Sequence, residues 1–239
     1  MKRTDTEYSR KGLMIARDYE HCLSSMCCHV SNDSYYGKPF LLEPFQRENI
    51  WKPLFACGEE KDGVFQRRFR RAIIGLPSGM GKTELAAGIV LTIATMEVRY
   101  NGQYGVVAST KEQVRNIFEK IGTMIKLNDT LSQQWDIQKN VIVHKETGAK
   151  IMVLPNKADA LESWHFNVLV FDELHVYRDD KVWAAGLKGQ KVLENPLSIG
   201  ITTAGDSREG FLWDTLEKAD DDPGMYLYCL GLDDGDDID

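Results

Sequence analysis

The chain has 239 residues, a formal net charge of −7 and an apolar content of 43 %. This length suits one sizeable domain with a small annex, and the composition is that of an ordinary globular protein. Its apolar runs are too short to span a bilayer, so we expect no membrane segment and a protein of the cell interior. The acidic total argues against a surface that coats DNA everywhere. A basic strip at residues 67–71 could still meet phosphates, although a solvated surface ahead of a strand explains it more simply.

The first sixty residues are predicted to be mainly helical. Apolar and aromatic residues recur at helical spacing over residues 7–28, and a turn-rich passage follows at 31–34. A second helix is expected to start near Pro44, because proline is tolerated in a first helical turn. We therefore assign residues 1–60 to a helical segment that packs on the rest of the chain.

Strands and helices are predicted to alternate from residue 71 onward. Strands are expected at 71–76, 103–109, 168–171 and 197–202, the last of these being the final strand of the core, with a hairpin at 141–154 and helices at 82–97, from 110 onward and at 183–193. This alternation predicts an α/β fold with a mainly parallel sheet covered by helices on both faces. We assign residues 61–205 to this core and 206–239 to a lid or linker segment that ends in an acidic tail.

Residues 76–83 have most of the pattern of a phosphate-binding loop, GxxxxGK[ST]. The last three positions match, while Leu76 stands where the first glycine belongs. Gly79 and Gly81 give the backbone the freedom to turn its N–H groups around phosphates, Lys82 can reach the terminal phosphates, and Thr83 can ligate Mg²⁺. A glycine-rich turn with an incidental Lys-Thr pair is the alternative. The residues expected to bind nucleotide here are Pro77, Ser78, Gly79, Met80, Gly81, Lys82, Thr83 and Glu84.

An apolar strand at 168–171 ends in two carboxylates, Asp172 and Glu173. Because parallel strands present their carboxyl ends at one edge, Asp172 is expected beside the phosphate loop as a ligand of Mg²⁺. Glu173 is predicted to polarise the attacking water as general base, with Lys82 as the second catalytic residue. An ordinary strand end with acidic caps remains the alternative. Together the two motifs predict a P-loop ATPase of the catalytic-glutamate subclass that uses ATP and Mg²⁺.

Four segments in this order resemble the large terminase subunit of tailed bacteriophages, and most of all the branch that includes the HK97-type phages. They are residues 42–46, the Leu-Pro opening of the phosphate loop, 171–175 and 201–205, and the likeness runs from about residue 40 to 215. The resemblance implies that Gln46 contacts adenine and that Thr202 and Thr203 form a coupling motif. The alternatives are a glutamine on a helix surface and threonines that only end a strand. His175 is expected to be a packed histidine.

The resemblance also implies a motor that drives double-stranded DNA into a procapsid, in the host cell cytoplasm. Its implied partners are DNA, the portal protein, the small terminase subunit and further copies of itself in a ring, with a monomer expected in isolation. Ring motors commonly borrow an arginine from a neighbour. The candidates are Arg99, Arg115, Arg178 and Arg208. Large terminases also carry a nuclease, and the chain ends soon after the ATPase motifs, so we expect the ATPase half only, without DNA cleavage.

Two other functions fit part of the sequence. A helicase-like ATPase that remodels nucleic acid would need a second motor domain, for which 239 residues leave no room. A nucleotide-binding assembly module without turnover would need no general base, and Glu173 argues against it.

Overall fold

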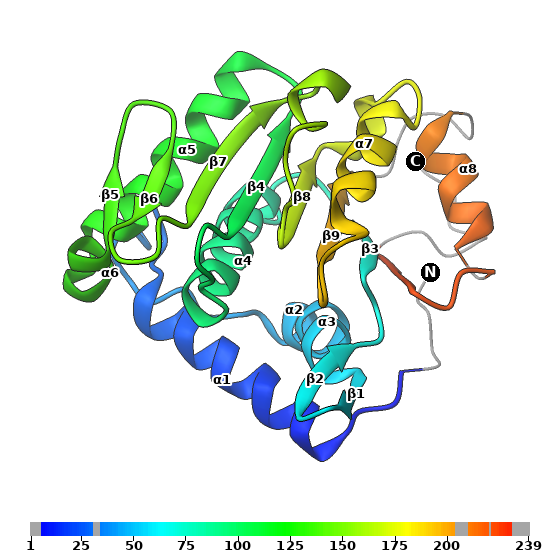
Figure 1. Ribbon diagram of the computed structural model, residues 1–239, viewed down its shortest axis with the longest axis horizontal. Coiled ribbons are helices and arrows are strands. Elements are labelled where there is room, and N and C mark those ends of the chain that lie inside the picture. The colour runs from blue at the N-terminus through cyan, green and yellow to red at the C-terminus, as the bar shows by residue number, and fades with distance from the viewer. Residues whose placement is uncertain (1–5, 31–33, 204–209, 220, 231–239) are drawn as a thin grey trace.

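The computed structural model describes residues 6–30, 34–203, 210–219 and 221–230, which form an eight-stranded sheet, a separate hairpin and the helices around them (Figure 1). The strand order is β10-β3-β9-β8-β4-β7-β6-β5, and the first six strands run parallel. β6 and β5 extend the sheet in antiparallel fashion, which confirms the predicted hairpin between β6 and β7. The strands are β3 (Arg71–Gly75), β4 (Gln103–Ala108), β5 (Trp135–Ile137), β6 (Ile142–His144), β7 (Lys150–Pro155), β8 (Val168–Asp172), β9 (Leu197–Thr202) and β10 (Met225–Cys229).

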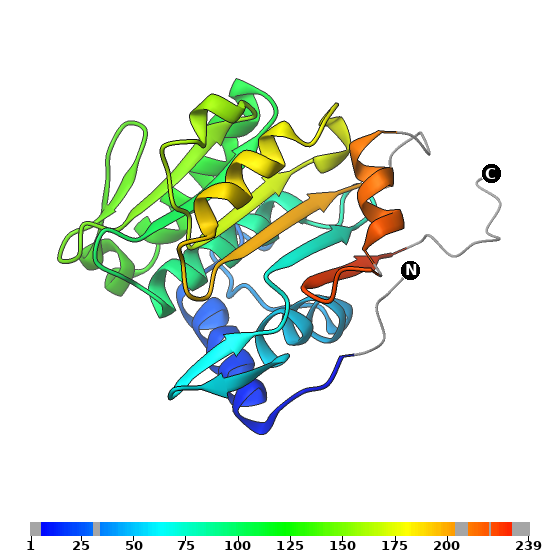
Figure 2. The same cartoon turned by 45° about the vertical axis from the view of Figure 1, so that its right-hand side comes forward.

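Helices cover both faces of this sheet, as predicted. One buried cluster joins one face to α1 (Arg10–Met26), α3 (Lys52–Ala56), α4 (Lys82–Met96) and α5 (Lys111–Lys126). A second cluster joins the other face to α7 (Lys181–Gln190) and α8 (Phe211–Lys218). Neighbouring residues of a strand divide between the clusters, Val170 facing α4 and Phe171 facing α7, because strand side chains alternate. In Figure 2 α7 lies in front of the strands and α4 behind them.

The N-terminal helices belong to the same core as the sheet. Ser9 caps α1 by accepting a hydrogen bond from the Gly12 N–H at 3.0 Å. The Trp51 indole donates to the Ala16 carbonyl at 2.8 Å, which fixes α1 against the second helical stretch. That stretch starts at Pro44 as predicted, but consists of α2 (Pro44–Gln46), the π-helical turn η1 (Arg47–Trp51) and α3.

A two-stranded hairpin, β1 (Gly58–Lys61) and β2 (Val64–Arg67), was not predicted. Its turn consists of Asp62 and Gly63, both at positive φ, and an Asp-Gly pair is a common hairpin turn. The buried Arg67 guanidinium pairs with Glu97 at the end of α4, and the Tyr19 hydroxyl of α1 donates to the same carboxylate at 2.8 Å. The hairpin is therefore tied to two helices.

The prediction that 197–202 is the last strand of the core is wrong. Residues 225–229 form β10, which pairs in parallel with β3 from Met225 opposite Arg71 to Cys229 opposite Gly75. All five residues of β10 are buried, and the strand covers the edge that β3 would otherwise expose. Five further elements were not predicted: α6 (Asp129–Gln134), β5, α8 and the short helices η2 (Ala158–Ala160) and η3 (Leu174–Val176).

In the described part of the chain, no helix is long and apolar enough to cross a membrane.

Candidate active site

The phosphate loop connects β3 to α4 at the carboxyl edge of the sheet. Gly79 and Gly81 adopt φ of +80° and +70°, and a Cβ added at either would meet no atom within 4 Å. Backbone conformation, and not lack of space, therefore calls for glycine at both positions. Residues 77–79 are exposed and Met80 is half-buried, so the loop is open to a ligand.

Leu76 explains the departure from the usual loop pattern. Its side chain is fully buried in the core, and its N–H donates to the Thr202 carbonyl at 2.9 Å. Leu76 thus continues the pairing of β3 with β9 by one residue, and the loop itself begins at Pro77.

Lys82, the first residue of α4, is buried at the base of the loop. Its ammonium donates to the carbonyl oxygens of Leu76 at 3.2 Å and Pro77 at 3.1 Å. Gly81, the N-cap of α4, has no side chain with which to cap the first turn. The loop therefore combines a positive charge with the amino end of a fifteen-residue helix, an arrangement that favours bound anions.

The carboxylate of Glu84, the last residue of the predicted nucleotide-binding set, is engaged within the protein. Its carboxylate accepts from the Val30 N–H at 2.6 Å and lies 3.2 Å from Nδ1 of His29. Burial alone would raise the pKa of Glu84, but the Val30 N–H and His29 hold it below its ordinary value. Both carboxylate oxygens are thus engaged by the N-terminal segment, so this side chain anchors the start of α4 to that segment.

Asp172 ends β8 with its side chain buried, at 2 % exposure. Among the described residues, its Oδ1 has no hydrogen-bond partner. Burial, supported by the charge of Glu173, raises the pKa of Asp172 to about 6, although the charge of Lys82 opposes this. A buried carboxylate oxygen without a partner at the edge of a sheet is a suitable ligand for a cation.

The donors around Asp172 fit Mg²⁺. Thr83 lies on the first turn of α4, next to Lys82, and offers a hydroxyl. Mg²⁺ usually keeps several waters and takes one or two protein ligands together with substrate phosphates. In the described ranges no group of three His, Cys, Asp or Glu side chains could hold a metal ion, so a cage made only of protein ligands is not found there.

Glu173 follows in a left-handed backbone conformation, with φ of 51° and ψ of 55°. This conformation costs a residue other than glycine about 1 kcal/mol or more, and such strain is typical of functional sites. It turns the chain from β8 into the short helix η3 (Leu174–Val176). The Glu173 side chain is 24 % exposed, so part of this carboxylate is open to water, although its Oε2 is buried and has no hydrogen-bond partner among the described residues.

β9 lies between the loop strand β3 and the acidic strand β8, so its end is in the middle of the site. The register places Gly75 opposite Thr202 and Asp172 opposite Ile201. The carbonyl of Thr202 accepts from the Leu76 N–H, and its hydroxyl accepts from the His175 N–H at 3.1 Å. Thr202 therefore links the phosphate loop to the turn that carries Glu173.

His175 is not the packed histidine that the sequence led us to expect. Its side chain is 30 % exposed, and its Nδ1 lies close to Thr202, Thr203 and Glu173. Nothing in the sequence indicated that these four residues meet, because their contact depends on β8 and β9 being neighbours in the sheet.

Gln46 is buried, at 6 % exposure, which excludes the alternative of a glutamine on a helix surface. Its Oε1 accepts from the Glu43 N–H at 3.0 Å at the start of α2. Three residues further along, the carbonyl of Asn49 accepts from the Tyr226 hydroxyl of β10 at 2.6 Å. Gln46 thus lies on the segment that packs against β10, the strand beside the loop strand β3.

The four candidate arginines lie in different places. Arg99 lies between α4 and β4, at the opposite edge of the sheet from the phosphate loop. Arg115 is on α5, 75 % exposed and 3.7 Å from Glu119, and Arg178 is exposed just after η3. Arg208 lies outside the described residues.

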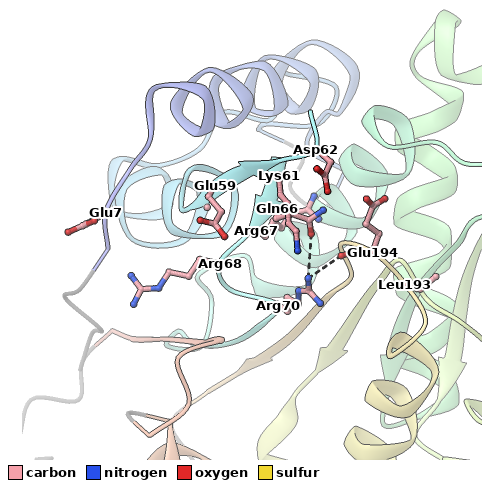
Figure 3. A pocket seen from close by; sticks show the side chains of 11 residues that line it. Glu7, Glu59, Lys61, Asp62, Gln66, Arg67, Arg68, Arg70, Leu193 and Glu194 are labelled. Carbon is pink, nitrogen blue, oxygen red and sulfur yellow. Dashed lines mark hydrogen bonds between the residues drawn. The ribbon is translucent and has the colours of Figure 1, made fainter. Parts of the chain in front are cut away.

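The basic strip at residues 67–71 lies at the amino edge, where a cavity of about 910 Å³ is found. Figure 3 shows Arg70 joined by hydrogen bonds to Gln66 and Glu194. Arg67 is buried and not solvated as expected, and Arg71 forms an ion pair with Asp222 at 2.8 Å. Four acidic side chains line this cavity together with the basic ones, so the wall of the cavity is not a cationic surface. These are Glu7, Glu59, Asp62 and Glu194.

Comparisons with known proteins identify the family of this chain. The family described as "Terminase large subunit, ATPase domain" matches residues 58–221. The terminase large subunit of Lactococcus phage p2 is 26 % identical over 204 residues, which cover 81 % of this chain and 38 % of that protein. The chain thus spans about two fifths of the length of this relative.

Two solved structures share the fold. The crystal structure of the HK97 bacteriophage large terminase has a TM-score of 0.76 and 21 % identity, covering 93 % of this chain and 45 % of that one. A large terminase from a thermophilic bacteriophage, in complex with ADP, has a TM-score of 0.52 and 13 % identity, covering 70 % of this chain and 42 % of that one. Because the family match covers more than half of the chain and includes the phosphate loop and the acidic pair, the chain belongs to the family of terminase large subunit ATPase domains and is an ATP-hydrolysing enzyme.

Proposed function

We propose that this chain is the motor domain of a viral DNA-packaging terminase, which hydrolyses Mg²⁺-bound ATP to drive double-stranded DNA into a procapsid. One observation carries the proposal. The phosphate loop, the acidic pair and the threonine pair follow β3, β8 and β9, three neighbouring strands whose carboxyl ends meet at one edge.

The phosphates would be held by the backbone of residues 77–81 and by Lys82. In the structure the Lys82 ammonium donates to two loop carbonyls, so it would turn from these to the phosphate oxygens when nucleotide binds. Gln46 is proposed to contact adenine through its amide nitrogen, since its Oε1 is used within α2. Glu84 is omitted from this set because its carboxylate is engaged elsewhere.

Thr83 and the buried oxygen of Asp172 would hold Mg²⁺, which when bound neutralises charge on the phosphates. Glu173, partly exposed at the same edge, would accept a proton from the attacking water and orient it. The position of a second carboxylate directly after the metal-binding one supports the catalytic-glutamate subclass. Thr202 and Thr203, at the end of the strand between the two motifs, would couple the state of the nucleotide to movement.

Membership of this family supports a proposal for the remaining partners. We propose double-stranded DNA, a portal protein and a small terminase subunit, a ring of copies during packaging, a monomer in isolation, and the host cell cytoplasm as the compartment. Among the arginines, Arg115 and Arg178 suit donation to a neighbouring copy best, since both are exposed near the carboxyl edge. Arg99 and Arg208 remain candidates.

The test is Mg²⁺-dependent ATP hydrolysis by the purified chain, with and without double-stranded DNA. Lys82→Ala should lower turnover by about 10²-fold or more, because the charge that stabilises the transition state is lost. Lys139→Ala, at an exposed lysine, is the matched control and should match the wild type. DNA should stimulate the wild type.

Two results would contradict the proposal. Nucleotide binding without turnover at any protein concentration, with DNA present, would support an assembly module. ATP-dependent separation of the strands of a duplex would support a helicase-like remodeller.

A further inference from the structure

We propose that His175 is a positioning residue that links the general base Glu173 to the coupling threonines Thr202 and Thr203. The inference rests on the function proposed above and adds a part that neither of the two motifs contains.

The geometry is centred on one ring atom. Nδ1 of His175 lies 3.1 Å from Oγ1 of Thr202, 3.3 Å from Oγ1 of Thr203 and 3.3 Å from Oε2 of Glu173. A single ring nitrogen carries at most one hydrogen, so these oxygen atoms compete for it. The strand that ends in the acidic pair and the strand that ends in the threonine pair thus meet at His175.

The other hydrogen bonds of Thr202 determine whether Nδ1 of His175 donates to Oγ1 of Thr202 or accepts from it. The Thr202 hydroxyl donates its hydrogen to the Thr203 carbonyl at 2.9 Å, and its oxygen accepts from the His175 N–H at 3.1 Å. Toward the ring, Oγ1 of Thr202 can therefore only accept. The ionised Glu173 carboxylate is also only an acceptor. Nδ1 then carries the hydrogen and donates it to Thr202, which fixes the tautomer of His175. Oε2 of Glu173 lies 3.3 Å from the same nitrogen and has no hydrogen-bond partner among the described residues, so it is the acceptor to which this hydrogen can turn.

Packing holds the histidine at this distance from β9. The preceding residue, Leu174, is fully buried and lies over Gly200 of β9. A Cβ added at Gly200 would come within 2.5 Å of Cδ2 of Leu174, so a larger residue there would push η3 away from β9. The missing side chain at Gly200 thus lets η3 sit closely enough for His175 to reach the threonines.

The arrangement has a consequence for the catalytic cycle. The Thr202 carbonyl accepts a hydrogen bond from the Leu76 N–H, so movement of the phosphate loop would displace the end of β9. If a γ-phosphate draws the threonine hydroxyls toward itself, the Nδ1–H of His175 is left to Glu173 alone. The Glu173 carboxylate is then held in one orientation toward water only while ATP is present.

The kinetic test compares His175→Ala with His175→Asn. The alanine variant should lower kcat by about 10- to 100-fold, because the base loses its orientation, and should leave KM for ATP nearly unchanged. The asparagine amide can replace the Nδ1–H donor and should restore most of the loss. His21→Ala, at an exposed histidine on α1, is the control and should behave as the wild type. A merely structural role would instead lower the stability of the alanine variant and leave kcat per folded molecule unchanged.

A second measurement does not depend on turnover. With ¹⁵N-labelled histidine, the ring signals that disappear in His175→Asn belong to His175, and NMR should show its hydrogen on Nδ1 in the nucleotide-free chain. Hydrogen on Nε2 would overturn the inference, as would wild-type kcat in His175→Ala beside an inactive Glu173→Gln; both results leave the proposed function intact. If the wild type hydrolyses no ATP, the proposed function fails, and the NMR result alone decides the placement of His175.

Discussion

The two neighbouring carboxylates at the end of β8 differ in exposure, and this difference supports the separate roles proposed for them. Each has one buried oxygen that lacks a partner among the described residues, but Asp172 is only 2 % exposed, whereas the Glu173 side chain is 24 % exposed. A buried carboxylate without enough partners is suited to a cation, and a partly hydrated one to a water molecule. The left-handed turn at Glu173 creates the difference, since it takes the chain out of the strand.

The raised pKa of Asp172 predicts that removing its charge stabilises the nucleotide-free protein. A pKa of about 6 in the folded chain, against 3.8 as the ordinary value, corresponds to roughly 3 kcal/mol of destabilisation once the group is ionised. The sign follows from the direction of the shift. The destabilisation is absent below pH 3.8, grows between pH 3.8 and 6, and is complete above pH 6.

Asp172→Asn should therefore unfold at a higher temperature than the wild type at pH 8, by an amount worth about 1–3 kcal/mol, and at nearly the same temperature at pH 4. Scanning calorimetry at the two pH values measures both differences. A variant less stable than the wild type at pH 8 would mean that the ionised Asp172 is stabilised by groups other than a metal.

The helix α1 is held to α3 through a close backbone approach at Gly12. A Cβ at this position would lie 2.1 Å from the carbonyl oxygen of Ala56, and a backbone atom cannot yield as a flexible side chain does. The close approach places the Trp51 ring against α1, where its indole reaches the Ala16 carbonyl. The spacing of these helices is therefore set by one residue without a side chain.

Gly12→Ala should destabilise the protein by about 2 kcal/mol or more, because overpacking outweighs the gain of at most about 1 kcal/mol in helix propensity. The matched control is Gly122→Ala in α5, where the nearest atoms to the new Cβ are 3.8 Å away. That variant should be as stable as the wild type or more so. Urea unfolding compares the two, and equal stabilities would show that α1 shifts without cost.

The elements predicted correctly are those whose pattern is local. The phosphate loop fixes the end of β3 and the start of α4, and the capping box at Thr110 and Gln113 marks the start of α5. The apolar run of β8 ends in its carboxylates as expected. In each case the element is predicted by the types and spacing of its own residues, without reference to distant parts of the chain.

The elements that were missed had weaker or overlooked patterns. The Asp62-Gly63 pair predicts a hairpin, but the strands beside it are short and largely charged. Residues 225–229 are a short apolar run near acidic residues, and their burial depends on pairing with β3, which is distant in sequence. The meeting of His175 with Thr202 depends on β9 lying beside β8, and strand order is a property of the whole sheet.

At the scale of the whole molecule, β10 connects the C-terminal part of the chain to the loop strand. Its Tyr226 is fully buried, its ring lies 5.3 Å from that of Phe69, and its hydroxyl donates to the Asn49 carbonyl at 2.6 Å. Three segments distant in sequence therefore meet beside β3. The strand that leads into the phosphate loop is thus flanked by a strand that is itself packed on the N-terminal segment.

Tyr226→Ala should cost about 3–5 kcal/mol, because it leaves a cavity and an unpaired carbonyl in the core. Tyr100→Ala removes a side chain that is 83 % exposed and should change the free energy of unfolding very little. Thermal unfolding of the two variants measures the difference. A small effect at Tyr226 would indicate that β10 contributes little to the sheet.

The role of Glu173 is tested most directly by measuring both Mg²⁺-ATP affinity and single-turnover hydrolysis on one preparation of Glu173→Gln. Affinity should stay close to that of the wild type, while hydrolysis should fall by about 10²–10⁴-fold, because the general base is lost and the shape is kept. Glu146→Gln, at an exposed glutamate in the β6–β7 turn, should match the wild type in both. Hydrolysis at the wild-type rate in Glu173→Gln, or a loss of affinity as large as the loss of rate, would contradict a catalytic role for Glu173.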